Sequence, residues 1–307
     1  MKKILKMLVL FAAMILLLAP FDATAKKTKQ KKAPVAENVI FIGSDGFGAF
    51  IVRDNPGVFP NIEKLAARGS STLEMRSVLP SSSAVNWASH LMGAGPELHG
   101  YTEWGSKTPD LPSRVVTVSG MFPDIFGLVR AGYPDGEMGV FYPWGGIGYL
   151  FDTTAVNVNA LVPDDSAMTA RAVDYVLGRK PKFAFFYFAE PDGVGHGKGW
   201  ESPEYFEMCK QIDTYTGQIL DAIEQAGMRD NTVVIFTSDH GGTGKGHGGK
   251  SMQEMQVPWI IAGPGIKKGY TVPESMMVFD DAATIARIFG IQQPQVWIGR
   301  APESIFE

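Results

Sequence analysis

The sequence is poor in cysteine, in histidine and in long apolar runs. Cys209 is the only cysteine among 307 residues, so no disulfide within the chain can stabilise the fold. A hydrophobic core must do so, and 45% hydrophobic residues supply enough side chains for one. The longest uncharged apolar run, Met7 to Ala19, is shorter than the about 20 residues that a membrane-spanning helix needs.

The N-terminal residues have the pattern of a secretory signal. Lysines within residues 2–6 precede the apolar run, and Ala23-Thr24-Ala25 offers small residues for cleavage after Ala25. We therefore expect residues 1–25 to be a signal peptide, with an uncleaved membrane anchor as the alternative. The expected protein is periplasmic or secreted and has no membrane span after cleavage.

Excess positive charge is confined to the N-terminal part of the chain. Five lysines lie within residues 26–32, which predicts a basic flexible tail over residues 26–36. The whole chain carries a formal charge of −4; residues 1–25 contribute +2 and the five lysines +5, which leaves −11 on the remainder. This acidic remainder argues against general nucleic-acid binding. A phosphate-binding site here therefore needs a local source of positive charge, which metal ions would supply.

Short apolar runs alternate with helical patterns over residues 37–307, and no internal repeat interrupts them. Such alternation predicts a mostly parallel sheet with helices on both faces, within a single domain. The expected strands are Val39–Ile42, Thr72–Leu79, Met138–Phe141, Phe183–Phe188, Val233–Phe236 and Trp259–Ala262. The expected helices are Asn61–Arg68, Ala84–Met92, Pro123–Ala131, Ser166–Leu177, Ser202–Ala226 and Asp281–Phe289.

Three of these apolar strands run into an aspartate. Asp45 follows the first strand, Asp192 follows the phenylalanine-rich strand and Asp239 follows Val233–Phe236. Because ligands bind beyond the carboxyl ends of parallel strands, the three carboxylates are expected along one rim of the sheet. Aspartate is also common in turns and helix caps, so each carboxylate alone is a weak signal.

Three of the five histidines lie close to these aspartates in the sequence. His196 ends Asp192-Gly-Val-Gly-His196, His240 follows Asp239 directly, and His247 lies in a glycine-rich segment seven residues later. Imidazole and carboxylate ligands together suit zinc, with manganese or iron as alternatives. The set predicts a metal site, whereas one isolated histidine would indicate a structural role.

Ser44-Asp45-Gly46, the Asp-x-x-Gly-His segment and Ser238-Asp239-His240-Gly241, in this order, resemble the alkaline phosphatase superfamily. The branch they are most similar to is the type I phosphodiesterase/nucleotide pyrophosphatase group, over roughly residues 38–290. The resemblance implies a three-layer α/β/α sandwich and two divalent metal ions. It assigns one ion to Asp192, His196 and His247, and the other to Asp45, Asp239 and His240.

The resemblance also implies a serine or threonine nucleophile at the start of a helix, three residues before an asparagine. Ser83 and Asn86 have this spacing, with Asn86 as the implied phosphate contact. The N-terminus of a helix favours a bound phosphate. Ser81 and Ser82 remain alternatives, because the sequence alone barely separates three neighbouring serines. We expect His99 in a structural turn, and His90 in packing or at the surface.

The expected activity is hydrolysis of a phosphodiester or pyrophosphate bond of a small-molecule phosphate ester, through a phosphoserine intermediate. An alkaline phosphomonoesterase is the alternative, and Lys245 or Lys250 could neutralise its additional charge. A sulfatase is disfavoured, because no Cys or Ser followed by x-Pro-x-Arg occurs between Ser81 and Trp87. A non-catalytic metal-binding protein is the remaining class. Four aromatic residues are candidates to stack on a leaving group: Tyr101, Trp104, Tyr142 and Trp144.

Overall fold

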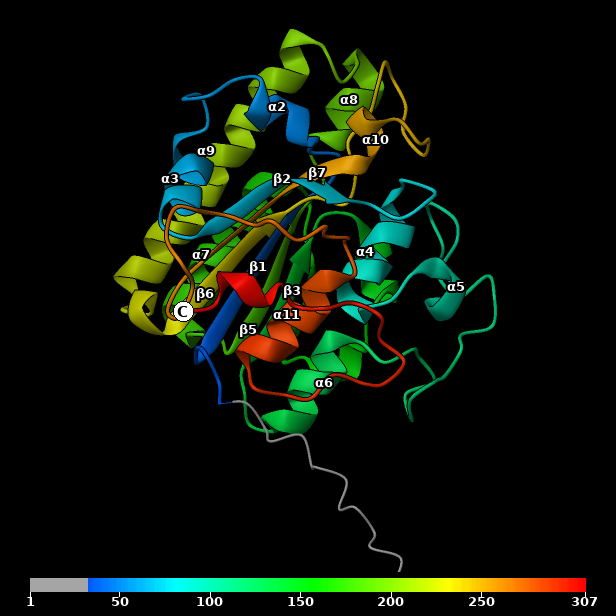
Figure 1. Cartoon of the computed structure of the whole chain (residues 1–307), viewed down its shortest axis with the longest axis vertical. Coiled ribbons are helices and arrows are strands. Elements are labelled where there is room, and N and C mark those ends of the chain that lie inside the picture. Colours follow the sequence, from blue (N-terminus) through cyan, green and yellow to red (C-terminus); the bar gives the residue numbers. More distant parts are fainter. Residues whose placement is uncertain (1–32) are drawn as a thin grey trace, which may run out of the picture. The chain divides into compact units, whose positions relative to one another are not determined.

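Eight strands form a single sheet within residues 33–307, the part of the chain that the computed structural model describes (Figure 1). The predicted signal peptide and most of the predicted tail lie outside the described residues. The strands are β1 (Asn38–Ser44), β2 (Ser70–Arg76), β3 (Met138–Tyr142), β4 (Val158–Leu161), β5 (Phe183–Phe188), β6 (Thr232–Thr237), β7 (Gln256–Ala262) and β8 (Tyr270–Thr271). Their order is β4-β3-β5-β1-β6-β7-β2-β8. Only β7 runs against its neighbours, so the sheet is mostly parallel, as predicted.

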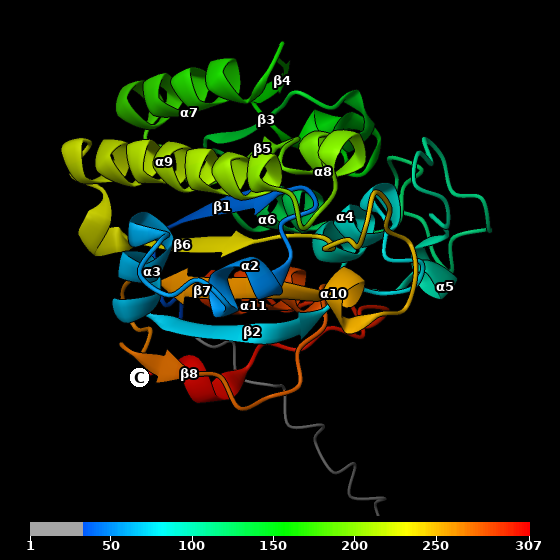
Figure 2. The ribbon, with the colours of Figure 1, turned by 90° about the horizontal axis from the view of Figure 1, so that it is seen from above.

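Helices connect most of the strands and cover both faces of the sheet. They are α2 (Ala49–Arg53), α3 (Pro60–Ala67), α4 (Ser83–Met92), α5 (Pro96–His99), α6 (Ile125–Gly132), α7 (Asp165–Arg179), α8 (Asp192–Lys198), α9 (Pro203–Gln225), α10 (Met252–Met255) and α11 (Asp280–Ile288). Figure 2 shows α7 and α9 side by side along one face.

Side chains of the central strand β1 alternate between two apolar clusters. Val39 and Phe41 pack with residues of α4, α6 and α11 on one face. Ile40 and Ile42 pack with residues of α3, α7 and α9 on the other. A strand that is buried on both faces must be apolar throughout, which explains the near-continuous apolar sequence of β1 and β5. The two clusters confirm the predicted three-layer α/β/α sandwich.

Polar side chains mark where several helices begin. Asp124 accepts hydrogen bonds from two backbone N–H groups of α6, Asp164 accepts one from α7, and Ser202 accepts one from α9. These caps satisfy N–H groups that have no partner within the helix. The predicted strands and the long predicted helices all occur, with ends shifted by a few residues.

Six of these helices and strands were not predicted from the sequence, namely α2, α5, α8, α10 and the short strands β4 and β8. Helix α8 matters most, because Asp192 and His196 lie on it. Three of its seven residues are glycine, which disfavours a helix in isolation, so only the tertiary context stabilises it.

The start of the described chain is already part of the fold. The Val35 N–H donates to the carbonyl of Ile288, and Ala36 is buried. Across residues 33–307, no helix combines the length and the apolar character that crossing a bilayer requires.

Candidate metal centre

Three aspartates lie at the ends of three adjacent strands. Asp45 follows β1, Asp192 begins α8 after β5, and Asp239 follows β6. Strand β1 pairs with both β5 and β6, so the three carboxylates meet at one rim of the sheet. The backbone brings them still closer, since the Asp192 N–H donates to the carbonyl of Asp45 over 3.1 Å.

One group at this rim consists of Asp45, Asp239 and His240, all of them buried. His240 Nε2 lies 3.3 Å from Asp45 Oδ1 and 3.2 Å from Asp239 Oδ2. The ligand atoms of all three residues lie within 4.8 Å of one another. This spacing is compatible with a single ion bound between them.

A second group consists of Asp192, His196 and His247. His247 Nε2 lies 3.1 Å from His196 Nε2 and 3.6 Å from Asp192 Oδ1, and His196 Nε2 lies 3.6 Å from Asp192 Oδ2. The rings of His240 and His247 stack with their centroids 3.8 Å apart, so the two groups adjoin. All six ligands implied by the resemblance are thus brought together in one cluster at the rim of the sheet.

The three histidines share a hydrogen-bonding pattern that turns Nε2 toward the cluster. In each of them Nδ1 faces a backbone carbonyl, at 3.0 Å for His196, 2.8 Å for His240 and 2.9 Å for His247. A carbonyl only accepts, so each Nδ1 carries a hydrogen, and each Nε2 faces the other members of the cluster. This arrangement of the outer hydrogen bonds orients histidine ligands in metal sites.

Two carboxylate atoms of the cluster are buried and have no hydrogen-bond donor, namely Asp192 Oδ1 and Asp239 Oδ2. Buried polar atoms are almost always paired, and a bound cation is one explanation for an exception. These atoms, together with the three Nε2 atoms, form a set of oxygen and nitrogen ligand atoms that suits zinc.

Burial and mutual repulsion set the protonation of this cluster. Burial and the neighbouring Asp45 raise the pKa of Asp239 well above its ordinary value, and they raise that of Asp192 to about 7. Burial, with a smaller contribution from His240, lowers the pKa of His247 to about 4, so this imidazole is neutral at pH 7. Neighbouring carboxylates that disfavour each other's ionisation need a compensating positive charge.

Of the three neighbouring serines, Ser83 has its hydroxyl in the cluster. Ser83 Oγ lies 3.3 Å from both Asp45 Oδ1 and His240 Nε2. The Ser81 hydroxyl instead donates to the carbonyl of Gly249 over 2.7 Å. The Ser82 hydroxyl is buried and has no partner among the described residues.

Asn86 is placed differently from the phosphate contact that the resemblance implies. Its side chain is fully buried and is hydrogen-bonded to the backbone of the segment before α4, accepting from the N–H of Val78 and donating to the carbonyls of Pro80 and Ser82. In the structure Asn86 therefore fixes the segment that leads to Ser83.

Two aromatic residues that the sequence did not single out hold Asp45 in place. The Tyr187 hydroxyl and Trp87 Nε1 both donate to Asp45 Oδ2, over 2.5 and 3.2 Å. A Cβ at Gly43 would lie 2.4 Å from the Trp87 ring, so glycine is required there for the indole to approach β1. Trp87 follows Ser83 by one helical turn, and this spacing is the only signal in the sequence that could have indicated its role.

The two remaining histidines are buried outside the cluster. His90 Nδ1 lies 2.6 Å from Asp281 Oδ2, and its Nε2 faces the carbonyl of Ser238 at 3.1 Å. Both nitrogens are engaged outside the cluster, by the Asp281 carboxylate and the Ser238 carbonyl, so His90 offers no nitrogen to a metal there. His99 contacts the Ser89 hydroxyl and accepts from the N–H of Tyr101 within the turn after α5.

A cavity of about 730 Å³ opens over the cluster and over Ser83. Two of the four candidate aromatic residues, Trp104 and Trp144, line it. Tyr101 and Tyr142 do not, and their hydroxyls are hydrogen-bonded elsewhere. No lysine or arginine is among the described residues that line the cavity.

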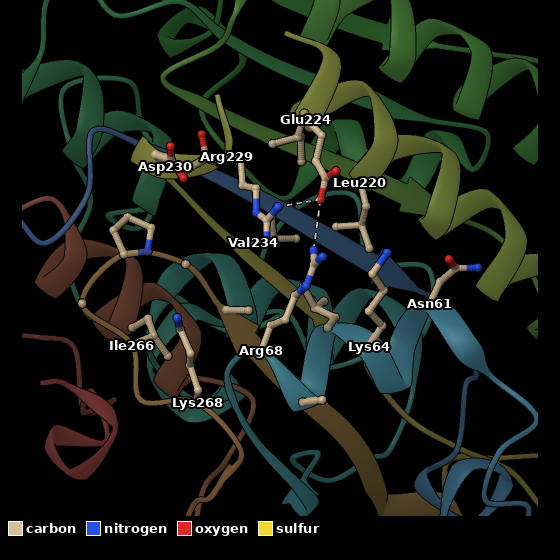
Figure 3. A pocket seen from close by; sticks show the side chains of 18 of the residues that line it. Asn61, Lys64, Arg68, Leu220, Glu224, Arg229, Asp230, Val234, Ile266 and Lys268 are labelled. Atoms are coloured by element: carbon tan, nitrogen blue, oxygen red, sulfur yellow. Dashed lines mark hydrogen bonds and ion pairs between the residues drawn. The ribbon is translucent and has the colours of Figure 1, made fainter. Parts of the chain in front are cut away.

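Figure 3 shows a second cavity, of about 460 Å³, at the opposite end of the sheet. The beginning of β6 and the end of β7 line it, together with α3 and the 3₁₀ helix Arg229–Asn231. Its two arginines, Arg68 and Arg229, share the Glu224 carboxylate. No histidine or cysteine is among the described residues that line it, so we assign the chemistry to the cavity over the aspartate cluster.

Comparison with known proteins agrees with the site. The family described as type I phosphodiesterase / nucleotide pyrophosphatase matches residues 39–124 and 150–246, more than half of the chain. Venom phosphodiesterase 2 of Crotalus adamanteus is 25% identical over 214 residues, which cover 66% of this chain and 26% of the venom protein. The chain therefore spans about a quarter of the length of that relative.

Solved structures share the fold at low sequence identity. Murine ectonucleotide pyrophosphatase/phosphodiesterase 5 in complex with AMP superposes with a TM-score of 0.68 at 15% identity, covering 84% of this chain and 96% of the murine one. A 2-O GAG sulfatase superposes with a TM-score of 0.69 at 16% identity, covering 87% of this chain and 73% of the sulfatase. Because the family match covers more than half of the chain, the chain belongs to the type I phosphodiesterase/nucleotide pyrophosphatase family.

Proposed function

We propose that this protein hydrolyses phosphodiesters with two divalent metal ions and with Ser83 as the nucleophile. The observation that carries the proposal is the convergence of three imidazole Nε2 atoms and three carboxylates beside the Ser83 hydroxyl. Zinc suits these donors, with manganese as the alternative. Two sets of ligands would hold the two ions: Asp45, Asp239 and His240 for one, and Asp192, His196 and His247 for the other.

Bound there, the two ions would supply positive charge that stabilises the phosphoryl oxygens and acidifies nearby hydroxyl groups. The Ser83 oxygen attacks phosphorus, so that a bond from Ser83 to phosphorus forms while the bond to the leaving alcohol breaks, and the alcohol departs with a proton. Water then hydrolyses the phosphoserine, which restores the Ser83 hydroxyl and releases a phosphomonoester.

The start of α4 favours this chemistry. Ser83 is its first residue, and the preceding Ser82 makes no side-chain hydrogen bond to the first turn. The positive end of the helix dipole therefore faces the position of the phosphoryl group. Asn86 and the Asp45 contacts hold Ser83 in position beside the metal ligands.

A diester is favoured over a monoester because the cavity offers no cationic side chain for the additional charge of a monoester. Lys245, one of the two candidates, donates to the carbonyl of Gly197 instead, and Lys250 does not line the cavity. A sulfatase shares the fold, but the sequence after Ser81 lacks the motif around the modified nucleophile of sulfatases. We also propose export through the signal over residues 1–25, with residues 37–307 as one catalytic domain.

The test of this function compares two neighbouring serines. We expect Ser83→Ala to keep its metal content and to lose hydrolysis of bis(p-nitrophenyl) phosphate by about 10³-fold or more, because the nucleophile is removed. Ser82→Ala is the matched control and should keep most of the activity, since the Ser82 hydroxyl has no partner. Metal content and turnover are measured on the same zinc-loaded preparations.

Substrate class is measured in parallel on the p-nitrophenyl monoester, diester and sulfate ester. The proposal requires the diester to have the highest kcat/KM. Unchanged turnover in Ser83→Ala would remove Ser83 from the mechanism, and a preference for the sulfate ester would reassign the protein to the sulfatase class.

A further inference from the structure

Helix α4 carries more than the proposed nucleophile at its start. Ser83, Trp87 and His90 follow one another at helical spacing, so their side chains lie on one face of α4. Ser83 Oγ lies 3.3 Å from Asp45 Oδ1, and Trp87 Nε1 donates to Asp45 Oδ2 over 3.2 Å. The first two residues of this face thus contact a metal ligand, whereas the proposed function gives the third, His90, no role.

His90 contacts the backbone that carries a second metal ligand. A carbonyl only accepts, so His90 Nε2 is the donor in its 3.1 Å contact with the carbonyl of Ser238. Ser238 lies between the end of β6 and Asp239, so this hydrogen bond holds the peptide group that joins Ser238 to Asp239. The Ser238 hydroxyl accepts from the N–H of Phe47 over 2.9 Å, which ties the same segment to the turn after β1.

Two further elements fix the orientation of the His90 ring. Asp281 Oδ2, in the first turn of α11, lies 2.6 Å from His90 Nδ1, and Trp259 Nε1 of β7 donates to Asp281 Oδ1 over 2.5 Å. The Trp87 ring stacks on that of His90 with the centroids 4.9 Å apart. All four side chains are fully buried, and hydrogen bonds in a buried network strengthen one another. The network therefore restrains the ring that meets Ser238.

Filling the core does not by itself explain these contacts. Apolar side chains of the same shape can replace both partners of a buried hydrogen bond at almost no cost in stability. His99 provides a contrast, because it is equally buried but contacts only the Ser89 hydroxyl and the N–H of Tyr101, within α4 and the turn after α5. Of these two histidines, His90 alone is hydrogen-bonded to the end of a strand that carries a metal ligand.

We infer that His90 is a positioning residue that holds Asp239 for metal binding, acting through the carbonyl of Ser238. This inference rests on the proposed function, which assigns Asp239 and Asp45 to the same ion. Hydrogen bonds outside the ligands themselves orient the ligands of a metal site. Because α4 also begins with Ser83, one face of this helix sets the nucleophile and the ligands of this ion relative to each other.

Three substitutions separate the two polar contacts of His90. The amide nitrogen of glutamine is as many bonds from Cα as imidazole Nε2, so His90→Gln keeps a donor for Ser238 and loses the contact with Asp281. His90→Asn does the reverse, because its shorter amide matches Nδ1. His90→Leu fills the space and loses both contacts.

Zinc affinity is the readout that distinguishes positioning from packing. We expect His90→Leu and His90→Asn to weaken zinc binding by about tenfold, because the hydrogen bond that holds the backbone of Asp239 is lost. His90→Gln should keep most of the affinity. All three should lower the Tm of the metal-free protein, since each leaves a buried polar group without its partner. Chelator competition measures the affinity, and it is repeated in His247→Ala, where only the Asp45, Asp239 and His240 set is complete.

His99→Leu is the matched control, because it removes the other fully buried histidine of this region. It should lower Tm and leave zinc affinity unchanged. Wild-type zinc affinity in His90→Leu would overturn the inference. So would an equal loss of affinity in His90→Gln and His90→Leu, or a comparable loss in His99→Leu.

Because zinc affinity is measured without substrate, the two proposals fail separately. A wild-type protein that binds zinc but hydrolyses no phosphodiester contradicts the proposed function, and the affinities of the His90 variants still decide the positioning role. A wild-type protein that binds no zinc contradicts both.

Discussion

At the scale of single residues, the hydrogen bond on Nδ1 separates the histidines of this protein. His196, His240 and His247 each use Nδ1 on a backbone carbonyl, which leaves Nε2 for a ligand. His90 uses both nitrogens outside the cluster, on the Asp281 carboxylate and the Ser238 carbonyl. The sequence does not show which atoms each imidazole nitrogen contacts, because these contacts form only in the folded protein.

His247→Ala tests the assignment of ligands to two ions. We expect metal per chain to fall by about half, because one donor of the Asp192 group is lost while the Asp45 group stays complete. Metal content is measured by mass spectrometry after zinc loading and dialysis. Lys250→Ala, an exposed residue of the same loop, is the control and should keep full occupancy. Loss of both ions together, or of neither, would contradict the assignment.

The candidate ligands were accessible from the sequence because each lies at or near the end of an apolar strand. Tyr187 and Trp87 were not, because their bonds to Asp45 join residues that are distant in the sequence. Asn86 was identified by its spacing from Ser83, but spacing does not reveal that the surrounding backbone occupies its amide.

At the scale of elements, contacts between neighbouring segments place α8 and its ligands. The Asp165 carboxylate, in the first turn of α7, accepts from the N–H groups of Ala189 and Glu190 over 2.8 and 3.0 Å. These N–H groups lie just before Asp192. A buried carboxylate from one helix thus fixes the loop that carries a metal ligand on another.

Removing this carboxylate tests the role of that contact. We expect Asp165→Ala to lower the free energy of unfolding of the metal-free protein by about 1–3 kcal/mol, because two partly buried N–H groups lose their acceptor. Zinc affinity should fall as well. Urea unfolding and chelator competition measure the two effects. Asp174→Ala removes an exposed carboxylate from the same helix and should change neither the stability nor the zinc affinity. If Asp165→Ala keeps the zinc affinity of the wild-type protein, this contact does not position Asp192.

The helices and strands that could be predicted from the sequence are those with a clear pattern of buried apolar residues. Strands β1, β5 and β6 are buried along almost their whole length, so apolar runs identified them. Helix α9 has a clear amphipathic period and was also predicted. Helix α8 is short and rich in glycine, and its position depends on contacts that α7 and the loop before it make in the folded protein.

At the scale of the whole molecule, stability and metal binding are linked. The described part of the chain carries a formal charge of −11, and three of its carboxylates lie together in the metal cluster. Ions that bind only the folded state stabilise it. Without them, the repulsion between Asp45, Asp192 and Asp239 remains in the folded protein.

Metal removal is therefore expected to lower Tm. Zinc present at about 100 times its Kd stabilises the folded state by about 2.7 kcal/mol. Removing it with a chelator should therefore lower Tm by about 5–10 °C. Differential scanning calorimetry with and without the chelator measures the shift. Asp45→Ala is the matched variant, and its Tm should respond about half as much, because the ligand set of Asp192, His196 and His247 stays complete. A wild-type Tm that is insensitive to the chelator would show that the cluster binds no stabilising ion.

The central claim is that six side chains hold two ions beside Ser83, and anomalous scattering from crystals of the zinc-loaded protein measures this directly. Data collected above and below the zinc edge should show two peaks about 4 Å apart. One should lie among Asp45, Asp239 and His240, and the other among Asp192, His196 and His247. A single peak, no peak, or peaks away from these side chains would contradict the account.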